Sequence, residues 1–160
     1  FLCWVLEHVP SPARVLAEVR RVLSPGSPVY VTEVMNASFL LDPYSPNVWR
    51  YWMAFNDFQI DSGGDPFVGA KLGNLLLGGG FRDVATSIKT FHLDNRDPAR
   101  RKQMIAFWEE LLLSAADQLL AAGKVDETIV AGVRSEMQQV QNDPDAVFFF
   151  SFVQARATVY

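Results

Sequence analysis

The chain has 160 residues, 49% of them hydrophobic and 20% charged, which is typical of a folded globular protein and excludes a disordered one. Its formal net charge of -4, without a long run of positive residues, argues against a nucleic-acid partner. No apolar stretch approaches the roughly 20 residues that cross a bilayer, so we expect no membrane partner.

The sequence contains one cysteine, Cys3, and two histidines. A single cysteine excludes an internal disulfide and suits a reducing compartment, so we expect a cytoplasmic protein. The histidines and acidic residues show no spacing typical of metal ligands, and we predict no metal site.

The first 34 residues predict a strand, a helix and a second strand. Residues 1–6 form an apolar strand that ends in a polar elbow at Glu7 and His8. Residues 29–34 are dominated by β-branched side chains and predict a buried strand. Because the connection is helical, the two strands should be parallel. The chain begins within a strand, so we expect a further segment before it.

The helix between these strands has clear signals at both ends. Ser11 is a plausible N-cap and Pro12 a plausible first helical residue, while Pro25 and Gly26 end the helix. Spacings of three and four residues place one set of apolar side chains on one face: Val15, Leu16, Val19, Val22 and Leu23.

Residues 42–64 predict a helical insert that is rich in aromatic side chains. A turn at residues 42–46 precedes it, and helical spacing places Trp49, Trp52 and Met53 on one side. Further apolar residues widen this surface: Val48, Tyr51, Phe55 and Phe58.

The remainder of the chain alternates helices and strands. We predict a helix after Asp65 and Pro66, a strand over 84–91, a long helix from Asp97 through Leu119, a helix over 125–141 and a closing strand over 147–159. Strands separated by helices indicate an α/β fold, which we expect to form a single domain over residues 1–160.

Residues 5–12, 16–26 and 29–33 together resemble class I S-adenosylmethionine-dependent methyltransferases. The likeness is to the fourth strand, the following helix and the fifth strand of that family. Residues 75–81 resemble the helix before the sixth strand, and the phenylalanine-rich closing strand resembles the seventh. The resemblance implies a Rossmann-like sheet, S-adenosylmethionine as cofactor and a small-molecule acceptor.

Two features depart from the family pattern. Gly26 is followed by Ser27, where the family usually has a second glycine. The family also holds its cofactor with a glycine-rich turn after the first strand and an acidic residue ending the second strand, and this sequence has neither. The glycines at 78–80 follow a predicted helix and do not fit that turn. The resemblance therefore implies the C-terminal half of a methyltransferase domain, either as a fragment or as a naturally incomplete protein.

The resemblance also implies candidate site residues near the first strand. Cys3 and Trp4 would form part of the cofactor wall, with the alternative that both are core residues. His8 would contact the cofactor and act as a base, because histidine exchanges a proton near neutral pH. Glu7 would orient His8 or cap the next helix. Glu33 would orient the substrate or pair with a cation at the cleft edge; the alternative for His8 and Glu33 is a structural role.

The aromatic insert is the candidate acceptor site. Trp49, Trp52, Met53 and Phe55 would cover a flat apolar substrate, with a core or interface role as the alternative. His92 is expected to be structural.

The sequence thus predicts methyl transfer to a small, aromatic or apolar acceptor. The alternative is a catalytically incomplete module that acts in binding or assembly. In that case we expect a homodimer, formed through the exposed edge of the first strand or by a swapped element.

Overall fold

A computed structural model describes residues 1–160 and divides them into two compact units. Unit 1 consists of Phe1–Ser38, Gln59–Thr90 and Ser151–Tyr160, and unit 2 of Phe39–Phe58 and Phe91–Phe150. Helices and strands alternate along the chain, so the α/β class predicted from the sequence is confirmed. No helix is both long and apolar enough to pass through a membrane.

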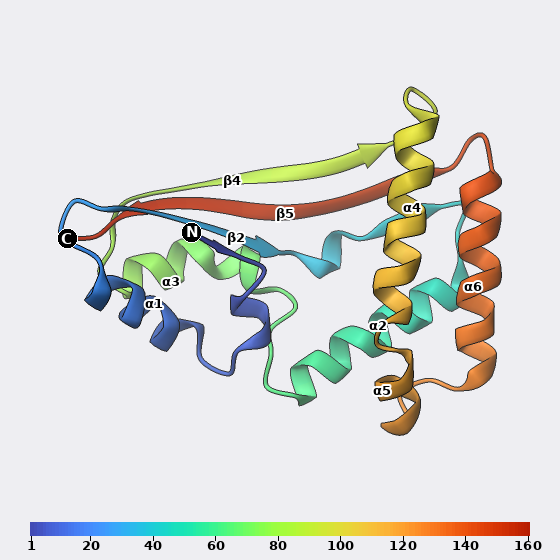
Figure 1. The fold of residues 1–160 in the computed structure, drawn as a ribbon, viewed down its shortest axis with the longest axis horizontal. Coiled ribbons are helices and arrows are strands. Elements are labelled where there is room, and N and C mark those ends of the chain that lie inside the picture. The colour runs from blue at the N-terminus through green and yellow to red at the C-terminus, as the bar shows by residue number, and fades with distance from the viewer. The chain divides into compact units, whose positions relative to one another are not determined.

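The sheet of unit 1 begins with two parallel strands, as predicted. β1 (Leu2–Cys3) lies beside β2 (Pro28–Val34), with Cys3 opposite Thr32. β5 (Val147–Thr158) runs antiparallel to β2, and β4 (Arg82–Leu93) pairs with β5. β5 therefore lies between β2 and β4, and β1 is an edge strand (Figure 1).

The first strand is shorter than predicted. Only Leu2–Cys3 is extended, because Trp4 adopts a φ of 53° and Leu6–His8 forms a turn of 3-10 helix, η1. A positive φ interrupts the extended backbone and ends the pairing with β2. The predicted strand over residues 1–6 is therefore wrong beyond Cys3.

The helix between β1 and β2 forms where the sequence predicts it. α1 (Pro12–Val22) starts at the proline, and Ser11 holds the N-cap position without a side-chain cap bond. Leu16 is the residue of the predicted apolar face that is fully buried, whereas Val22 is 64% exposed. The predicted face is therefore only partly used as a core surface.

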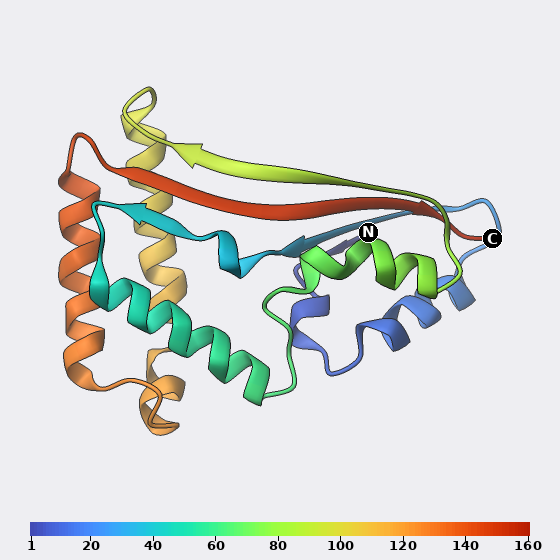
Figure 2. The ribbon, with the colours of Figure 1, turned by 180° about the vertical axis from the view of Figure 1, so that it is seen from behind.

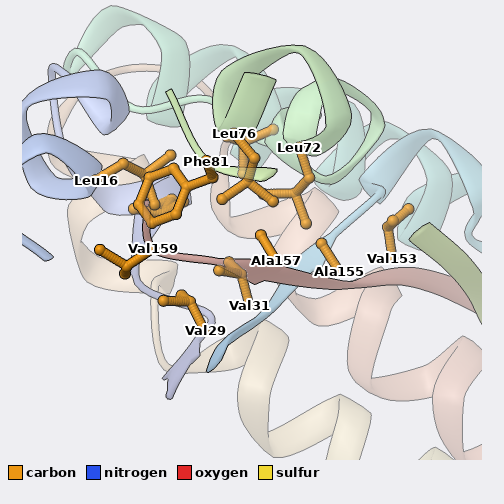
Figure 3. Close-up of a cluster of buried hydrophobic side chains, with 12 residues drawn as sticks. Leu16, Val29, Val31, Leu72, Leu76, Phe81, Val153, Ala155, Ala157 and Val159 are labelled. Carbon is orange, nitrogen blue, oxygen red and sulfur yellow. The ribbon is translucent and has the colours of Figure 1, made fainter. Parts of the chain in front are cut away.

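The core of unit 1 joins α1 and α3 (Leu72–Gly78) to one face of β2 and β5 (Figures 1 and 2). Figure 3 shows Leu16, Leu72 and Leu76 facing the side chains of the strands. The cluster residues of β2 and β5 alternate along each strand, and the alternation continues one residue beyond the end of β5: Val29, Val31, Val153, Ala155, Ala157 and Val159. Full burial of each leucine contributes about 1.5–3 kcal/mol.

The predicted helix after Asp65 and Pro66 starts later than expected. A 3-10 segment, η3 (Val68–Lys71), precedes α3. Asp65 accepts a hydrogen bond from the backbone nitrogen of Phe67 at 3.1 Å and is bonded by Lys71 Nζ at 2.6 Å. These bonds form a turn in place of a first helical turn.

Unit 2 contains most of α2 (Pro46–Asp61), together with α4 (Pro98–Leu113), α5 (Ala116–Ala121) and α6 (Glu127–Asn142). α4 and α6 lie side by side and antiparallel (Figures 1 and 2). The long helix predicted from Asp97 through Leu119 is wrong in one respect, because it is interrupted at Ser114 and Ala115.

One strand of unit 2 is not predicted from the sequence. After the 3-10 turn η2 (Asn36–Ser38), β3 (Leu40–Asp42) pairs antiparallel with the start of β5, with Leu40 opposite Phe149. Three residues show no periodicity of their own, so the strand is defined by its partner.

The core of unit 2 is aromatic. The Trp108 ring lies 4.7 Å from that of Phe150, 5.1 Å from that of Phe148 and 5.6 Å from that of Phe39. Trp52 packs on Phe39 at 5.0 Å. Such ring pairs add about 0.5–1.5 kcal/mol each beyond the burial of area.

Candidate functional site

The candidate site of unit 1 is the segment from Trp4 to His8, which we call the elbow. It follows β1 at the edge where the parallel strands β1 and β2 both end. The backbone nitrogen of Trp4 donates to the carbonyl oxygen of Thr32 at 2.9 Å, the last bond between the two strands before the chain turns away. In open α/β sheets, ligands bind outside the carboxyl ends of such strands.

Glu33, near the end of β2, holds the elbow in place. Its Oε1 atom accepts hydrogen bonds from the backbone nitrogens of Val5 at 3.0 Å and Leu6 at 2.8 Å. The side chain of Glu33 is fully buried, so the expectation that it lies at the cleft edge is wrong. The bonds explain why the chain turns here, because they satisfy two amide groups that no longer pair with a strand.

Burial raises the pKa of the Glu33 carboxyl above its usual value of 4.5. The hydrogen bonds from Leu6 and Val5 oppose this shift, and the nearby charge of Glu7 adds to it. Glu33 Oε2 is buried and has no hydrogen-bond partner. A raised pKa favours the neutral acid, which needs no counter-charge in this buried position.

Gln59 connects the elbow to the end of α2. Its Nε2 atom donates to the carbonyl oxygen of Glu7 at 3.1 Å and to Glu7 Oε2 at 3.0 Å, and both side chains are almost fully buried. The same carbonyl accepts from the backbone nitrogen of Asp65 at 2.8 Å. A Cβ atom at Gly64 would lie 2.5 Å from it, so the close approach requires glycine.

Sequence reasoning did not identify Gln59 as a site residue. The available signal was helical spacing, which places the polar residues Asn56 and Gln59 on the side of α2 that carries Trp52; both are buried in the structure. Buried polar side chains of this kind have hydrogen-bond partners. A partner for Gln59 was therefore to be expected, although its identity was not.

His8 lies at the exposed end of this group. Its side chain is 61% exposed, and its Nε2 atom is 3.6 Å from Glu7 Oε1. Its Nδ1 atom is 3.4 Å from Gln59 Nε2. The structure thus brings together His8 and Glu7, which the sequence singled out, with Gln59.

The two predicted cofactor-wall residues differ in their surroundings. Cys3 is exposed, so its alternative reading as a core residue is wrong. Trp4 is partly buried, and its ring lies 6.5 Å from that of Phe152 in an edge-to-face arrangement. The indole nitrogen of Trp4 is buried without a hydrogen-bond partner.

The four predicted acceptor-binding residues lie in unit 2, on α2. Trp52 is 5% exposed and stacks on Phe55 with ring centres 5.8 Å apart. Trp49 and Met53 are 42% and 44% exposed. The three residues that helical spacing places on one side therefore differ in burial: Trp52 is buried together with Tyr51, whereas Trp49 and Met53 are partly exposed.

Tyr51 is fixed by a hydrogen bond from its hydroxyl to the carbonyl oxygen of Leu112, at 2.6 Å. Burial raises the pKa of Tyr51 to about 12, partly opposed by the charge of Arg134. His92 is exposed, with Nε2 3.7 Å from Asp94 Oδ2. No three His, Cys, Asp or Glu side chains are grouped to hold a metal ion.

Unit 1 also contains a cavity of about 300 Å³ against its sheet. The residues that line it come from β2, β4 and β5 and from the N-terminus: Phe1, Tyr30, Thr32, Ala85, Thr86, Ser87, Gln154, Ala155 and Arg156. Tyr30 and Thr32 alternate with the core residues of β2, so they lie on the opposite face from the helices. None of the elbow residues lines this cavity.

No protein-family model and no curated protein matches the sequence. Solved structures that match include Haemonchus contortus phosphoethanolamine N-methyltransferase 2 in complex with phosphomonomethylethanolamine and S-adenosylhomocysteine, at 14% identity and a TM-score of 0.45. The match covers 98% of this chain and 32% of that protein. A second is a Bacillus halodurans C-125 protein provisionally designated a methyltransferase, at 13% identity and a TM-score of 0.45, covering 98% of this chain and 66% of that protein.

The chain therefore spans less than two thirds of either structure. Both matched structures carry the name methyltransferase.

Proposed function

We propose that the chain takes part in S-adenosylmethionine-dependent methyl transfer to a small, aromatic or apolar acceptor, as the C-terminal part of such an enzyme. The observation that carries the proposal is the elbow itself. A segment with methyltransferase-like sequence leaves the sheet where two parallel strands end, and a buried carboxylate from the second strand holds it there. That edge is where α/β sheets bind their ligands.

The residues present fit part of a cofactor site. Cys3 offers an exposed side chain beside the elbow, and the unpaired indole N–H of Trp4 can donate to a polar group of a ligand. Gly78 ends α3, so the glycines at 78–80 do not supply the family's glycine-rich turn. When bound, the cofactor would supply an electrophilic methyl group.

The chain's own contribution to the reaction would be placement and proton transfer. His8 would take the proton that an acceptor oxygen or nitrogen loses, which its exposed ring permits. Glu33 would position the elbow through its hydrogen bonds to the backbone nitrogens of Val5 and Leu6. Of the proposed acceptor-binding residues, Trp49 and Met53 offer exposed apolar surface. Trp52 is buried and stacks on Phe55, so this pair would help to hold the helix in place.

The test is calorimetric titration of the chain with S-adenosylhomocysteine. We expect binding that is weakened by Trp4→Phe, which removes the indole N–H but keeps an aromatic ring. Trp49→Phe, on α2, is the matched control and should leave this affinity unchanged. If S-adenosylhomocysteine does not bind at all, the chain is not an active methyltransferase as it stands.

A second candidate is a binding or assembly module, favoured by the position of β1. β1 pairs with β2 on one side and has no strand on the other, so its free edge can pair with another chain. This reading predicts a homodimer in light scattering at micromolar concentration. A monodisperse monomer that still binds S-adenosylhomocysteine would exclude it.

A further inference from the structure

We infer that Glu7 and Gln59 are positioning residues for His8, which hold its ring with the proton on Nε2 and leave Nδ1 as the atom that accepts a proton. The catalytic part of this inference rests on the proposed methyl transfer. The arrangement of the three side chains does not, and it can be measured without turnover.

The contact between Gln59 and Glu7 is the fixed part of the arrangement. Gln59 Nε2 donates to the Glu7 carbonyl oxygen at 3.1 Å and to Glu7 Oε2 at 3.0 Å. If the amide were turned over, its oxygen would face these two acceptors and be repelled. The amide orientation is therefore set by its surroundings, and its two hydrogens are both directed to Glu7.

The other carboxylate oxygen of Glu7 faces the His8 ring. Oε1 is 3.6 Å from His8 Nε2, within ion-pair range but longer than a hydrogen bond. A carboxylate oxygen only accepts, so it favours the ring form that carries hydrogen on Nε2. Contacts of this kind in unliganded sites commonly shorten when substrate binds.

The remaining ring nitrogen, Nδ1, carries no hydrogen in this ring form and is therefore the one that can accept a proton. His8 Nδ1 is 3.4 Å from Gln59 Nε2, whose hydrogens already point at Glu7. This contact is consequently weak, and because the His8 side chain is 61% exposed, a hydroxyl or amine could replace it. His8 would then resemble other catalytic histidines, whose second nitrogen is oriented by a carboxylate.

The proton and electron changes balance on these groups. The acceptor O–H or N–H bond breaks, and its proton moves to His8 Nδ1. The electron pair of that O–H or N–H bond would form the new bond to the methyl carbon, and the carbon–sulfur bond of the methyl donor would break and leave its pair on sulfur. The resulting imidazolium keeps Nε2–H toward Glu7, whose charge stabilises it.

Long-range ¹H–¹⁵N NMR of the imidazole rings tests the arrangement directly. The chain has only two histidines, so a His92→Gln variant assigns both signals. In the wild type at a pH where His8 is neutral, we expect one ring form, with hydrogen on Nε2. Gln59→Met frees the Glu7 carboxylate, and Glu7→Gln offers the ring either an oxygen or an NH2 group; both should give a mixture of ring forms.

Asp94→Asn is the control, because Asp94 lies beside His92 and should leave the His8 signals unchanged. A mixture of ring forms in the wild type would overturn the inference, and so would a single form that persists in both folded variants. Circular dichroism identifies a variant that does not fold. If either Gln59→Met or Glu7→Gln fails to fold, the ring form measured in the other variant tests the inference.

Kinetics separate this inference from the proposed function. For an active enzyme we expect Gln59→Met and Glu7→Gln to lower kcat about 10- to 100-fold with KM unchanged, a fraction of the ~10²–10⁴-fold contribution of a general base. Failure of methyl transfer in the wild type would refute the proposed function. It would not affect the arrangement of His8, Glu7 and Gln59, which the NMR experiment measures independently. Unchanged kcat in variants with altered ring forms would refute the catalytic role of the pair.

Discussion

Glu33 Oε1 accepts a hydrogen bond from the backbone nitrogen of Leu6 at 2.8 Å, so a buried carboxyl at the end of β2 fixes the turn that follows β1. Its pKa is raised in the folded protein, mainly by burial. The folded state therefore binds the proton more tightly than the unfolded chain. This group's contribution to stability is full below the unfolded value of 4.5 and declines as pH rises through its folded pKa.

We expect Glu33→Gln to remove that decline. The amide oxygen can still accept from Val5 and Leu6, but it does not titrate. Urea denaturation of both proteins from pH 4 to pH 8 should show a difference in unfolding free energy that grows with pH in favour of the variant. A difference that is constant across this range would contradict the assignment of the shift to Glu33.

Glu136 caps α2 from the neighbouring helix α6. Its carboxylate accepts from the backbone nitrogens of Asn47 at 2.8 Å and Val48 at 3.0 Å, and from Asn47 Nδ2 at 2.6 Å. Glu136→Ala should cost about 1–3 kcal/mol, because it leaves the first amides of the helix unpaired and removes a negative charge from its positive end. Tryptophan fluorescence during urea unfolding measures this loss, and exposed Gln138→Ala on the same helix should change little.

Arg101 is buried and donates to three backbone carbonyls in the turn before β5. Its guanidinium bonds Asp143 at 2.7 Å, Pro144 at 2.8 Å and Ala146 at 3.2 Å. We expect Arg101→Met to destabilise the protein by about 2–4 kcal/mol, since it leaves buried carbonyls without donors. Arg100→Met provides a neighbouring exposed control that should stay within about 0.5 kcal/mol of wild type. If the two substitutions lowered the unfolding free energy equally, the hydrogen bonds of Arg101 to the turn would not be what stabilises the protein.

Tyr51 has a pKa of about 12 because it is buried. Its contribution to stability is present below the unfolded value of 10.0 and declines as pH rises toward 12. Rapid-mixing absorbance at 295 nm should show a tyrosine transition near pH 12 that Tyr51→Phe removes. The same variant should lose about 1 kcal/mol at pH 7, the usual net value of one hydrogen bond. A high-pH transition that survives the substitution would belong to another tyrosine.

Trp52 and Trp49 should respond differently to truncation. Trp52→Ala opens a gap in the aromatic core and should cost about 3–5 kcal/mol, whereas half-exposed Trp49→Ala should cost little. If Trp49 contacts the acceptor, its variant should raise KM without lowering the unfolding midpoint. A large loss of stability in Trp49→Ala would instead assign it a structural role.

The elements with strong local signals could be predicted from the sequence. α1 has a proline at its first position and Pro25 with Gly26 beyond its end, while β2 is a run of β-branched residues. β3 gave no signal, because three residues become a strand only through pairing with β5. The break after α4 lies at Ser114 and Ala115, in a segment that contains no glycine or proline.

The site was predictable in its residues but not in its connections. The resemblance over residues 5–33 identified His8 and Glu33, yet the carboxylate of Glu33 is directed at backbone amides of the elbow. Gln59 lies 51 residues from His8 along the chain. Only the folded backbone brings its amide to Glu7, so no local pattern could have revealed the contact.

The division of β5 between the units has a consequence for how the protein is made. Residues from Ser151 onward complete the sheet of unit 1 beside β2, and those through Phe150 belong to unit 2. At a synthesis rate of about 5–20 residues per second, Phe1–Ser38 waits several seconds for its partner strand. α1 and α3 can cover the apolar face of β2 in that time, but the edge of β2 that pairs with β5 keeps its backbone groups unpaired until β5 emerges.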